Sequence, residues 1–226
     1  MMGRFANVLQ SSIGAKVAMA VTGILLVLFI IAHMLGNLLM FAGPEATNAY
    51  AKGLKDLGAL LWVARIGLLV VFLVHIGSAL RLWRMNKAAR PQAYAVSEST
   101  MVTYAGRSIV LTGLLVLAFA AYHLLHFTLF ATNPEFAGLH DAQGRHDVYR
   151  MVILGFGNAA VSGVYLVSMI LLGLHLSHGV TSLFQSLGIN NPSYNPLIKR
   201  LGPWSGVLVA AGFMAIPLAV LAGVLK

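Results

Sequence analysis

The chain of 226 residues is 59% hydrophobic and only 9% charged, which is too apolar for an ordinary soluble domain. Its 15 basic and 6 acidic residues give a formal charge of +9, yet no nucleic-acid-binding motif accompanies this excess. The sequence contains no cysteine, so disulfides, iron–sulfur clusters and thiolate metal sites are excluded within this chain. Any iron bound here has to be held by histidine.

Five apolar segments are long enough to cross a hydrocarbon layer of about 30 Å as helices. We expect them at residues 17–42, 57–81, 103–131, 149–184 and 204–225. Helices are favoured over barrel strands because the segments are continuously apolar, and an open sheet would leave edge amides unpaired in lipid. The sequence therefore predicts an all-α, polytopic protein with one membrane domain over 1–226, whose first helix is retained after a short amphipathic lead-in.

The distribution of basic residues predicts the orientation. With the N-terminus inside, the inner side carries nine basic residues and one acid, Glu98, whereas the outer side carries six basic residues and five acids. The positive-inside rule then favours a cytoplasmic N-terminus and an outer C-terminus in a bacterial-type inner membrane. The inner basic residues are Arg4, Lys16, Arg81, Arg84, Lys87, Arg90, Arg107, Lys199 and Arg200. We interpret them as a topology signal that also meets anionic lipid or a partner subunit.

The first and third segments share the pattern Thr-Gly-x9-His, from Thr22-Gly23 to His33 and from Thr112-Gly113 to His123. Each histidine lies eight residues before the outer end of its segment, which is roughly 12 Å at 1.5 Å per residue. Ionisable groups inside membrane helices are rare and indicate function. We therefore expect both histidines at one level, called the outer level.

The second and fourth segments run inward, and each carries a histidine near the inner side. His75 comes six residues before Arg81, and His175 lies in the inner half of its segment, so we expect both at an inner level. Gly23 and Gly113 precede the outer histidines by ten residues, about 15 Å along a helix. They therefore fall near the inner level, where they either leave room for a flat macrocycle or only allow close helix packing.

Two imidazoles at one level, without a third or fourth ligand, do not complete a tetrahedral zinc site. They suit haem iron, because the porphyrin supplies its other four ligands. A bis-histidine haem has both axial positions filled, so it transfers electrons and does not bind oxygen. The histidine levels therefore predict two stacked haems b, one held by His33 and His123 and the other by His75 and His175.

Four stretches carry a family resemblance. They are VTGILLVLFIIAHMLGNL from Val21, GPEA from Gly43, YHLLHF from Tyr122, and LHLSHGVTSLFQSLG from Leu174. Over nearly its whole length the chain resembles the dihaem cytochrome b membrane-anchor subunit of succinate dehydrogenase and fumarate reductase. This resemblance implies a five-helix bundle in which His33 and His123 ligate the outer haem and His75 and His175 the inner one.

The resemblance also implies that FAD, the iron–sulfur clusters and the succinate site belong to a flavoprotein and an iron–sulfur subunit docked on the inner face. The chain itself has no Gly-x-Gly-x-x-Gly fingerprint and no soluble domain for a flavin. Its expected role is electron transfer between these partners and a quinone, by analogy menaquinone. The expected docking surface is the loop 81–107 with the connection 190–192. The direction of electron flow and the oligomeric state stay open.

Three positions refine this expectation. The Thr-Gly-x9-His repeat selects His123 over His126, and the family's spacing selects His175 over His178. His126 and His178 are therefore expected to pack or to form hydrogen bonds. Some members of the family carry a carboxylate two residues before the fourth ligand, where this chain has Gly173, so no dedicated proton path is expected.

Charged and loop residues supply further candidates. Arg65 is the only strong charge well inside a predicted span, where it either pairs with a propionate of the outer haem or extends outward. Lys16 and Arg107, at the inner starts of the first and third helices, are candidates for the propionates of the inner haem. His140 and His146 are expected in an outer surface loop, with an adventitious metal site as the alternative.

A quinone site needs a cavity beside a haem and a polar group that exchanges protons with water. The segment 43–50 follows closely after His33, and Glu45 is its only carboxylate. We expect an outer quinone site near Glu45, Asn48 and Tyr50, unless Glu45 and Asn48 only cap a short helix. The alternative is an inner site near Arg81, Trp83 and Arg107.

Two other functions fit parts of this pattern. A cytochrome b anchor of another quinone-linked enzyme, such as a hydrogenase or formate dehydrogenase, also holds two haems on histidine-rich helices. A histidine-rich metal or proton transporter is the more distant alternative. It is disfavoured because the apolar cores contain no Asp or Glu and no paired, broken helices.

Overall fold

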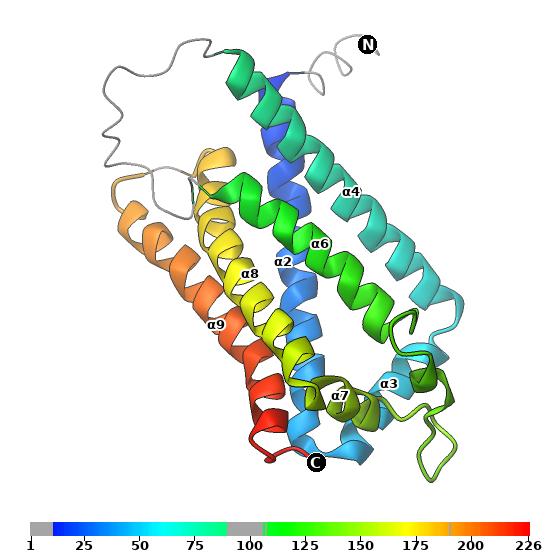
Figure 1. Ribbon diagram of the computed structural model, residues 1–226. Coiled ribbons are helices and arrows are strands. Elements are labelled where there is room, and N and C mark those ends of the chain that lie inside the picture. The colour runs from blue at the N-terminus through cyan, green and yellow to red at the C-terminus, as the bar shows by residue number, and fades with distance from the viewer. Residues whose placement is uncertain (1–10, 90–105, 107, 190) are drawn as a thin grey trace.

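The computed structural model describes residues 11–89, 106, 108–189 and 191–226. Five long helices form the body of these described parts (Figure 1). They are α2 (Ser12–Leu38), α4 (Ala59–Ala88), α6 (Ile109–Phe127), α8 (Ala159–Ser186) and α9 (Asn195–Leu221). Each is long and apolar enough to cross a membrane, which confirms the all-α, polytopic class.

The fourth predicted span, 149–184, is in fact two helices. A short helix α7 (Val148–Gly157) ends before Asn158, and α8 begins directly after it. The Asn158 side chain accepts hydrogen bonds from the backbone N–H groups of Ala160 and Val161, and so caps α8 at its start. The prediction merged the two helices because both are apolar.

Other boundaries differ in smaller ways. The first span continues from α2 into a 3₁₀ helix, η1 (Leu39–Ala42), and α4 extends to Ala88 rather than to residue 81. The last helix begins at Asn195 rather than at residue 204, because a proline favours its first turn and Ile198 is already buried there. The remaining elements are α3 (Pro44–Asp56) and the 3₁₀ helix η2 (Pro134–Gly138).

The bundle has two distinct ends (Figure 1). α2 begins at one, the N-terminal end, and α3, η2 and α7 lie at the other, the loop end, where α9 also ends. The described basic residues of the N-terminal end are Lys16, Arg81, Arg84, Lys87, Lys199 and Arg200, and no described acid accompanies them. The side of the membrane that each end faces stays a prediction.

Helices α8 and α9 make the most extensive contact in the bundle. A Cβ atom on Gly173 would lie 3.0 Å from the carbonyl oxygen of Gly206, so the two backbones approach closely, as small residues permit in membranes. Position 173 therefore faces α9 and has no room for a carboxylate. The other main pairings are α2 with α4 and α6 with α8.

Candidate functional site

His33 of α2 and His123 of α6 lie next to each other near the loop end. Their ring centres are 5.9 Å apart, and the ring planes are inclined by 79°. Two imidazoles bound to one ion at about 2 Å each would have ring centres roughly 6 Å apart. Phe29 and Phe213 pack on His33, with ring centres 5.5 and 5.8 Å away. The ring separation fits a shared ion, but Asn37 Nδ2 lies 3.3 Å from His33 Nε2, so His33 would have to give up this amide contact to bind one.

His75 of α4 and His175 of α8 are the two histidines expected at the inner level. Each is held by the Thr-Gly element of its neighbouring helix. The Nδ1 atom of His75 lies 3.2 Å from Thr22 Oγ1. That of His175 lies 3.3 Å from Thr112 Oγ1.

The threonine hydroxyls bear on which ring nitrogen carries the proton. Thr22 Oγ1 lies 2.7 and 3.2 Å from the carbonyl oxygens of Ala18 and Met19 in its own helix, which can accept its single proton. Thr112 Oγ1 lies 3.1 Å from each of the carbonyl oxygens three and four residues before it. A hydroxyl that donates to its own helix accepts from histidine Nδ1–H, and this tautomer leaves the Nε2 lone pair available to a metal.

The two glycines of the repeat sit beside the same imidazoles. A Cβ atom on Gly23 would lie 3.5 Å from His75 Cε1, and one on Gly113 would lie 3.2 Å from His175 Cε1. The glycines are therefore at the inner level, where they leave room for the imidazole rings of His75 and His175. Each Thr-Gly-x9-His helix thus carries one outer histidine. Eleven residues before it, the same helix carries the threonine that contacts an inner histidine.

The neighbouring histidines of both His-x-x-His pairs form hydrogen bonds of their own. His126 is buried, and its Nδ1 lies 3.0 Å from the Tyr165 hydroxyl. His178 Nε2 lies 3.0 Å from the Ser182 hydroxyl. Within the described ranges, no group of three or more His, Cys, Asp or Glu side chains is placed to hold a metal ion. A tetrahedral zinc site therefore has no candidate there, and neither has a loop metal site at His140 and His146.

The other cofactor and docking candidates are less constrained. Arg65 is exposed, with its guanidinium carbon 5.1 Å from the ring centre of Trp62. Lys16 and Trp83 are also exposed. Arg107 lies outside the described residues, as do 90–105 of the predicted docking loop, residue 190 of the 190–192 connection, and the lead-in 1–10.

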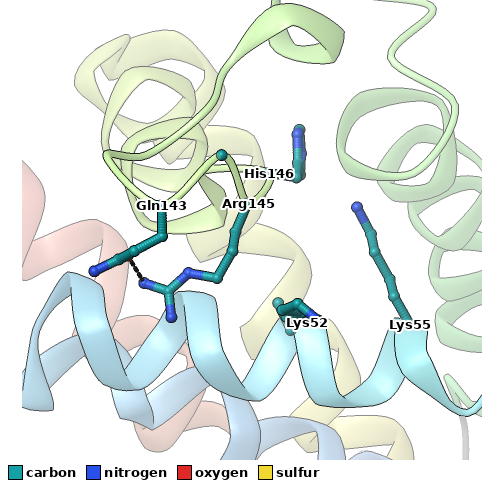
Figure 2. Close-up of a pocket in the computed structure, with 7 residues that line it drawn as sticks. Lys52, Lys55, Gln143, Arg145 and His146 are labelled. Carbon is teal, nitrogen blue, oxygen red and sulfur yellow. Dashed lines mark hydrogen bonds between the residues drawn. The ribbon is translucent and has the colours of Figure 1, made fainter.

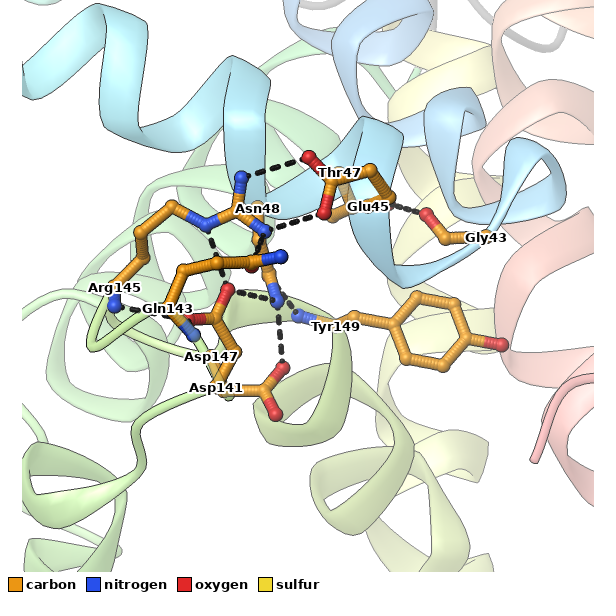
Figure 3. A network of polar contacts seen from close by, with 9 residues as sticks. All are labelled: Gly43, Glu45, Thr47, Asn48, Asp141, Gln143, Arg145, Asp147 and Tyr149. Atoms are coloured by element: carbon orange, nitrogen blue, oxygen red, sulfur yellow. Dashed lines mark hydrogen bonds and ion pairs between the residues drawn. The ribbon is translucent and has the colours of Figure 1, made fainter.

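Glu45, the carboxylate of the predicted outer quinone site, is bound by a residue that the sequence did not single out (Figure 3). Arg145 donates to both Glu45 oxygens, at 2.9 and 2.7 Å, and its Nε donates to Asp141 at 2.7 Å. The hydrogen bond from Arg145 holds the pKa of Glu45 below its usual value of 4.5. Glu45 is therefore an ion-paired carboxylate and is poorly suited to exchange protons with a quinone.

Asn48 is buried and joins α3 to the start of α7 (Figure 3). It donates to Asp147 at 3.0 Å and accepts from the backbone N–H of Tyr149 at 3.0 Å. The residue at the start of α3 is Gly43, with φ +95° and no side-chain capping bond, so neither Glu45 nor Asn48 caps the helix. Both instead form a clasp between α3 and the loop.

A cavity of about 130 Å³ lies next to this clasp, between α3 and the turn at 143–146 (Figure 2). Its lining includes Lys52, Lys55, Arg145 and His146. Burial, and then the charge of Lys55, lower the pKa of His146. The cavity is basic and small, and Tyr50 does not line it, because that ring packs on Gly36, where a Cβ atom would lie 2.7 Å from Tyr50 Cε1.

Comparison with known proteins gave no relatives: no family model, curated protein or solved structure matches the chain. The geometry of the histidines therefore has to carry the functional assignment, together with the motifs. Four histidines on four helices of one bundle, two with adjacent rings and two each beside a Thr-Gly element, are the feature that any proposed function has to explain.

Proposed function

We propose that this protein is a membrane-anchoring dihaem cytochrome b that carries electrons between a quinone and the catalytic subunits of a succinate:quinone oxidoreductase. The observation that carries the proposal is the inner pair. His75 and His175 come from different helices, yet each has its Nδ1 held by a threonine whose own proton is committed to the backbone. Such partners fix the tautomer that a metal-binding histidine needs.

In this proposal His33 with His123 and His75 with His175 hold the two irons. A bound haem would supply one-electron Fe(III)/Fe(II) chemistry, and the chain would supply its position, two histidine ligands and apolar surroundings. Thr22 and His33 are eleven residues apart on α2, which corresponds to roughly 16 Å along the helix. Two sites at that spacing connect the two ends of the bundle, as an electron carrier across a membrane requires.

The partner chains are inferred from the family resemblance. The N-terminal end of the bundle gathers six described basic residues, a surface suited to an acidic partner or to anionic lipid. Because Glu45 is paired with Arg145, we place the proposed quinone site at this end, near Arg81 and Trp83.

The test is a reduced-minus-oxidised absorption spectrum of the purified native complex, with haem counted by the pyridine haemochrome assay. We expect two haems b per chain and their reduction by succinate through a copurifying flavoprotein. A complex without haem would refute the proposal. Haem reduction by hydrogen or formate, but not by succinate, would assign the anchor to another quinone-linked enzyme.

A further inference from the structure

The outer level contains a second buried histidine that ligation does not use. His126, one turn beyond His123 on α6, is 1% exposed. Tyr165 of α8 is 5% exposed and lies between the two imidazoles. Its hydroxyl oxygen is 3.3 Å from His123 Nδ1 and 3.0 Å from His126 Nδ1. One hydroxyl is thus shared by the proposed ligand and its neighbour.

The number of available protons gives a direction to the hydrogen bonds from His123 through Tyr165 to His126. If His123 Nε2 faces the iron, the proton of this neutral ring is on Nδ1, and Nδ1–H donates to the Tyr165 oxygen. The single hydroxyl proton of Tyr165 is then free to donate to His126 Nδ1. His126 therefore has to be neutral, with its own proton on Nε2. The sequence of donors runs from His123 through Tyr165 to His126.

Packing holds the side chains of Tyr165 and His126 in place. The His126 ring stacks on Phe127, with ring centres 3.9 Å apart. A Cβ atom on Gly155 would lie 2.8 Å from Phe127 Cζ and 3.2 Å from His126 Cε1, so Gly155 lies against both rings. Phe156 contacts the Tyr165 ring edge-on, with ring centres 4.9 Å apart. Both side chains are thus packed between aromatic rings.

We propose that Tyr165 and His126 form a positioning pair that orients His123 and lowers the reduction potential of the outer haem. This inference rests on the proposed function. His126 accepts the Tyr165 proton, so that Tyr165 always presents a lone pair to His123. A ligand whose Nδ1–H is hydrogen-bonded donates more electron density to the metal, which stabilises the ferric state.

The experiment measures the potentials of both haems in Tyr165→Phe, His126→Leu and His126→Gln complexes. The outer haem is the one lost in His33→Ala. In Tyr165→Phe we expect its reduction equilibrium to shift toward ferrous iron by roughly fivefold, the value of one hydrogen bond. In His126→Leu we expect a smaller shift in the same direction, because Tyr165 keeps a lone pair for His123 but loses the acceptor that orients its hydroxyl. In His126→Gln the amide oxygen can accept the Tyr165 proton, so the potential of the outer haem should stay close to that of the wild type. The inner haem should not change in any variant.

The matched control is Tyr122→Phe, since the Tyr122 ring lies 5.9 Å from Tyr165 and stacks on His126 at 5.6 Å. It should leave both potentials unchanged. An outer haem that is present and unshifted in Tyr165→Phe overturns the inference, as does a shift in Tyr165→Phe of which His126→Leu shows no part. Selective loss of the outer haem in either variant also overturns it, because the pair is inferred to tune a haem that stays bound. Absence of haem from the wild-type complex instead refutes the proposed function.

Discussion

Replacing the two threonines of the inner level by valine tests the reasoning about the inner ligands. Thr22→Val and Thr112→Val keep the shape of the side chain and remove one hydroxyl each. His75 or His175 then loses one acceptor of its Nδ1–H, and the backbone carbonyl of Met19 or Ile109 remains beside the ring. The change is therefore confined to the electron density on one axial ligand.

The expected magnitude follows from the bonds. At 3.2 and 3.3 Å both are long, so each is worth roughly 0.5–1 kcal/mol. With 59 mV for a tenfold change in a one-electron couple, each variant should raise the potential of the inner haem by roughly 20–45 mV. The two positions are on different helices and contact different ligands, so the shifts should add in the double variant.

The assay is an optical redox titration with both haems resolved. Thr47→Val is the matched control, because Thr47 is also buried and donates its hydroxyl to a backbone carbonyl, that of Gly43, but belongs to α3. Both haems bound with an unchanged inner potential in Thr22→Val and Thr112→Val would refute the tautomer assignment. A shift of the outer haem instead would show that the pairing of levels is wrong.

The remaining predictions concern ligation, space and the clasp. Alanine at His33 or His123 should remove the outer haem and alanine at His75 or His175 the inner one, whereas His126→Ala and His178→Ala should keep both, as haemochrome counts can show. Gly113→Ala should reduce inner-haem occupancy more than Gly23→Ala, because its Cβ atom would lie 3.2 Å rather than 3.5 Å from the ligand ring; equal occupancy would contradict this. Asn48→Ala should destabilise the loop end by roughly 2–4 kcal/mol, since it leaves Tyr149 N–H and Asp147 without their buried partner, and hydrogen exchange at 139–149 reports it. Because the pKa of Glu45 is lowered, the clasp should be intact above about pH 4.5 and loosen as the pH falls through the lowered value, whereas Glu45→Gln should loosen it at pH 7 and leave quinone turnover unchanged. A loss of turnover with both haems intact would restore Glu45 to the quinone site.

The levels of the histidines could be predicted because the rise of a helix is fixed, so that counting residues gives depth. His33 and His123 were expected at one level and their rings are in fact adjacent. The contact from Thr22 to His75 could not be found in this way, because depth does not say which face of a helix meets which neighbour. That information comes from packing, here the pairing of α2 with α4.

The break at Asn158 and the clasp were missed for different reasons. The run 149–184 is longer than one span needs, and Gly157-Asn158 is a recognisable stop and start, but continuous apolarity outweighed this local signal. Arg145 and Glu45 are 100 residues apart, so their ion pair depends on the path of the loop rather than on any local pattern. Among these contacts, only the ion pair between Asp141 and Arg145 joins residues close enough in sequence for their spacing to suggest it.

Helix α9 carries no histidine, yet the arrangement of the other four helices depends on it. The first four spans form two similar units, α2 with α4 and α6 with α8, each with a Thr-Gly element seating the histidine of the following helix. α9 packs on α8 of one unit through Gly173 and Gly206 and on α2 of the other through Gly212 and Met34. Its Phe213 ring also reaches His33. Because the proposed outer site takes one histidine from each unit, α9 helps to set the distance between His33 and His123 by packing on both units.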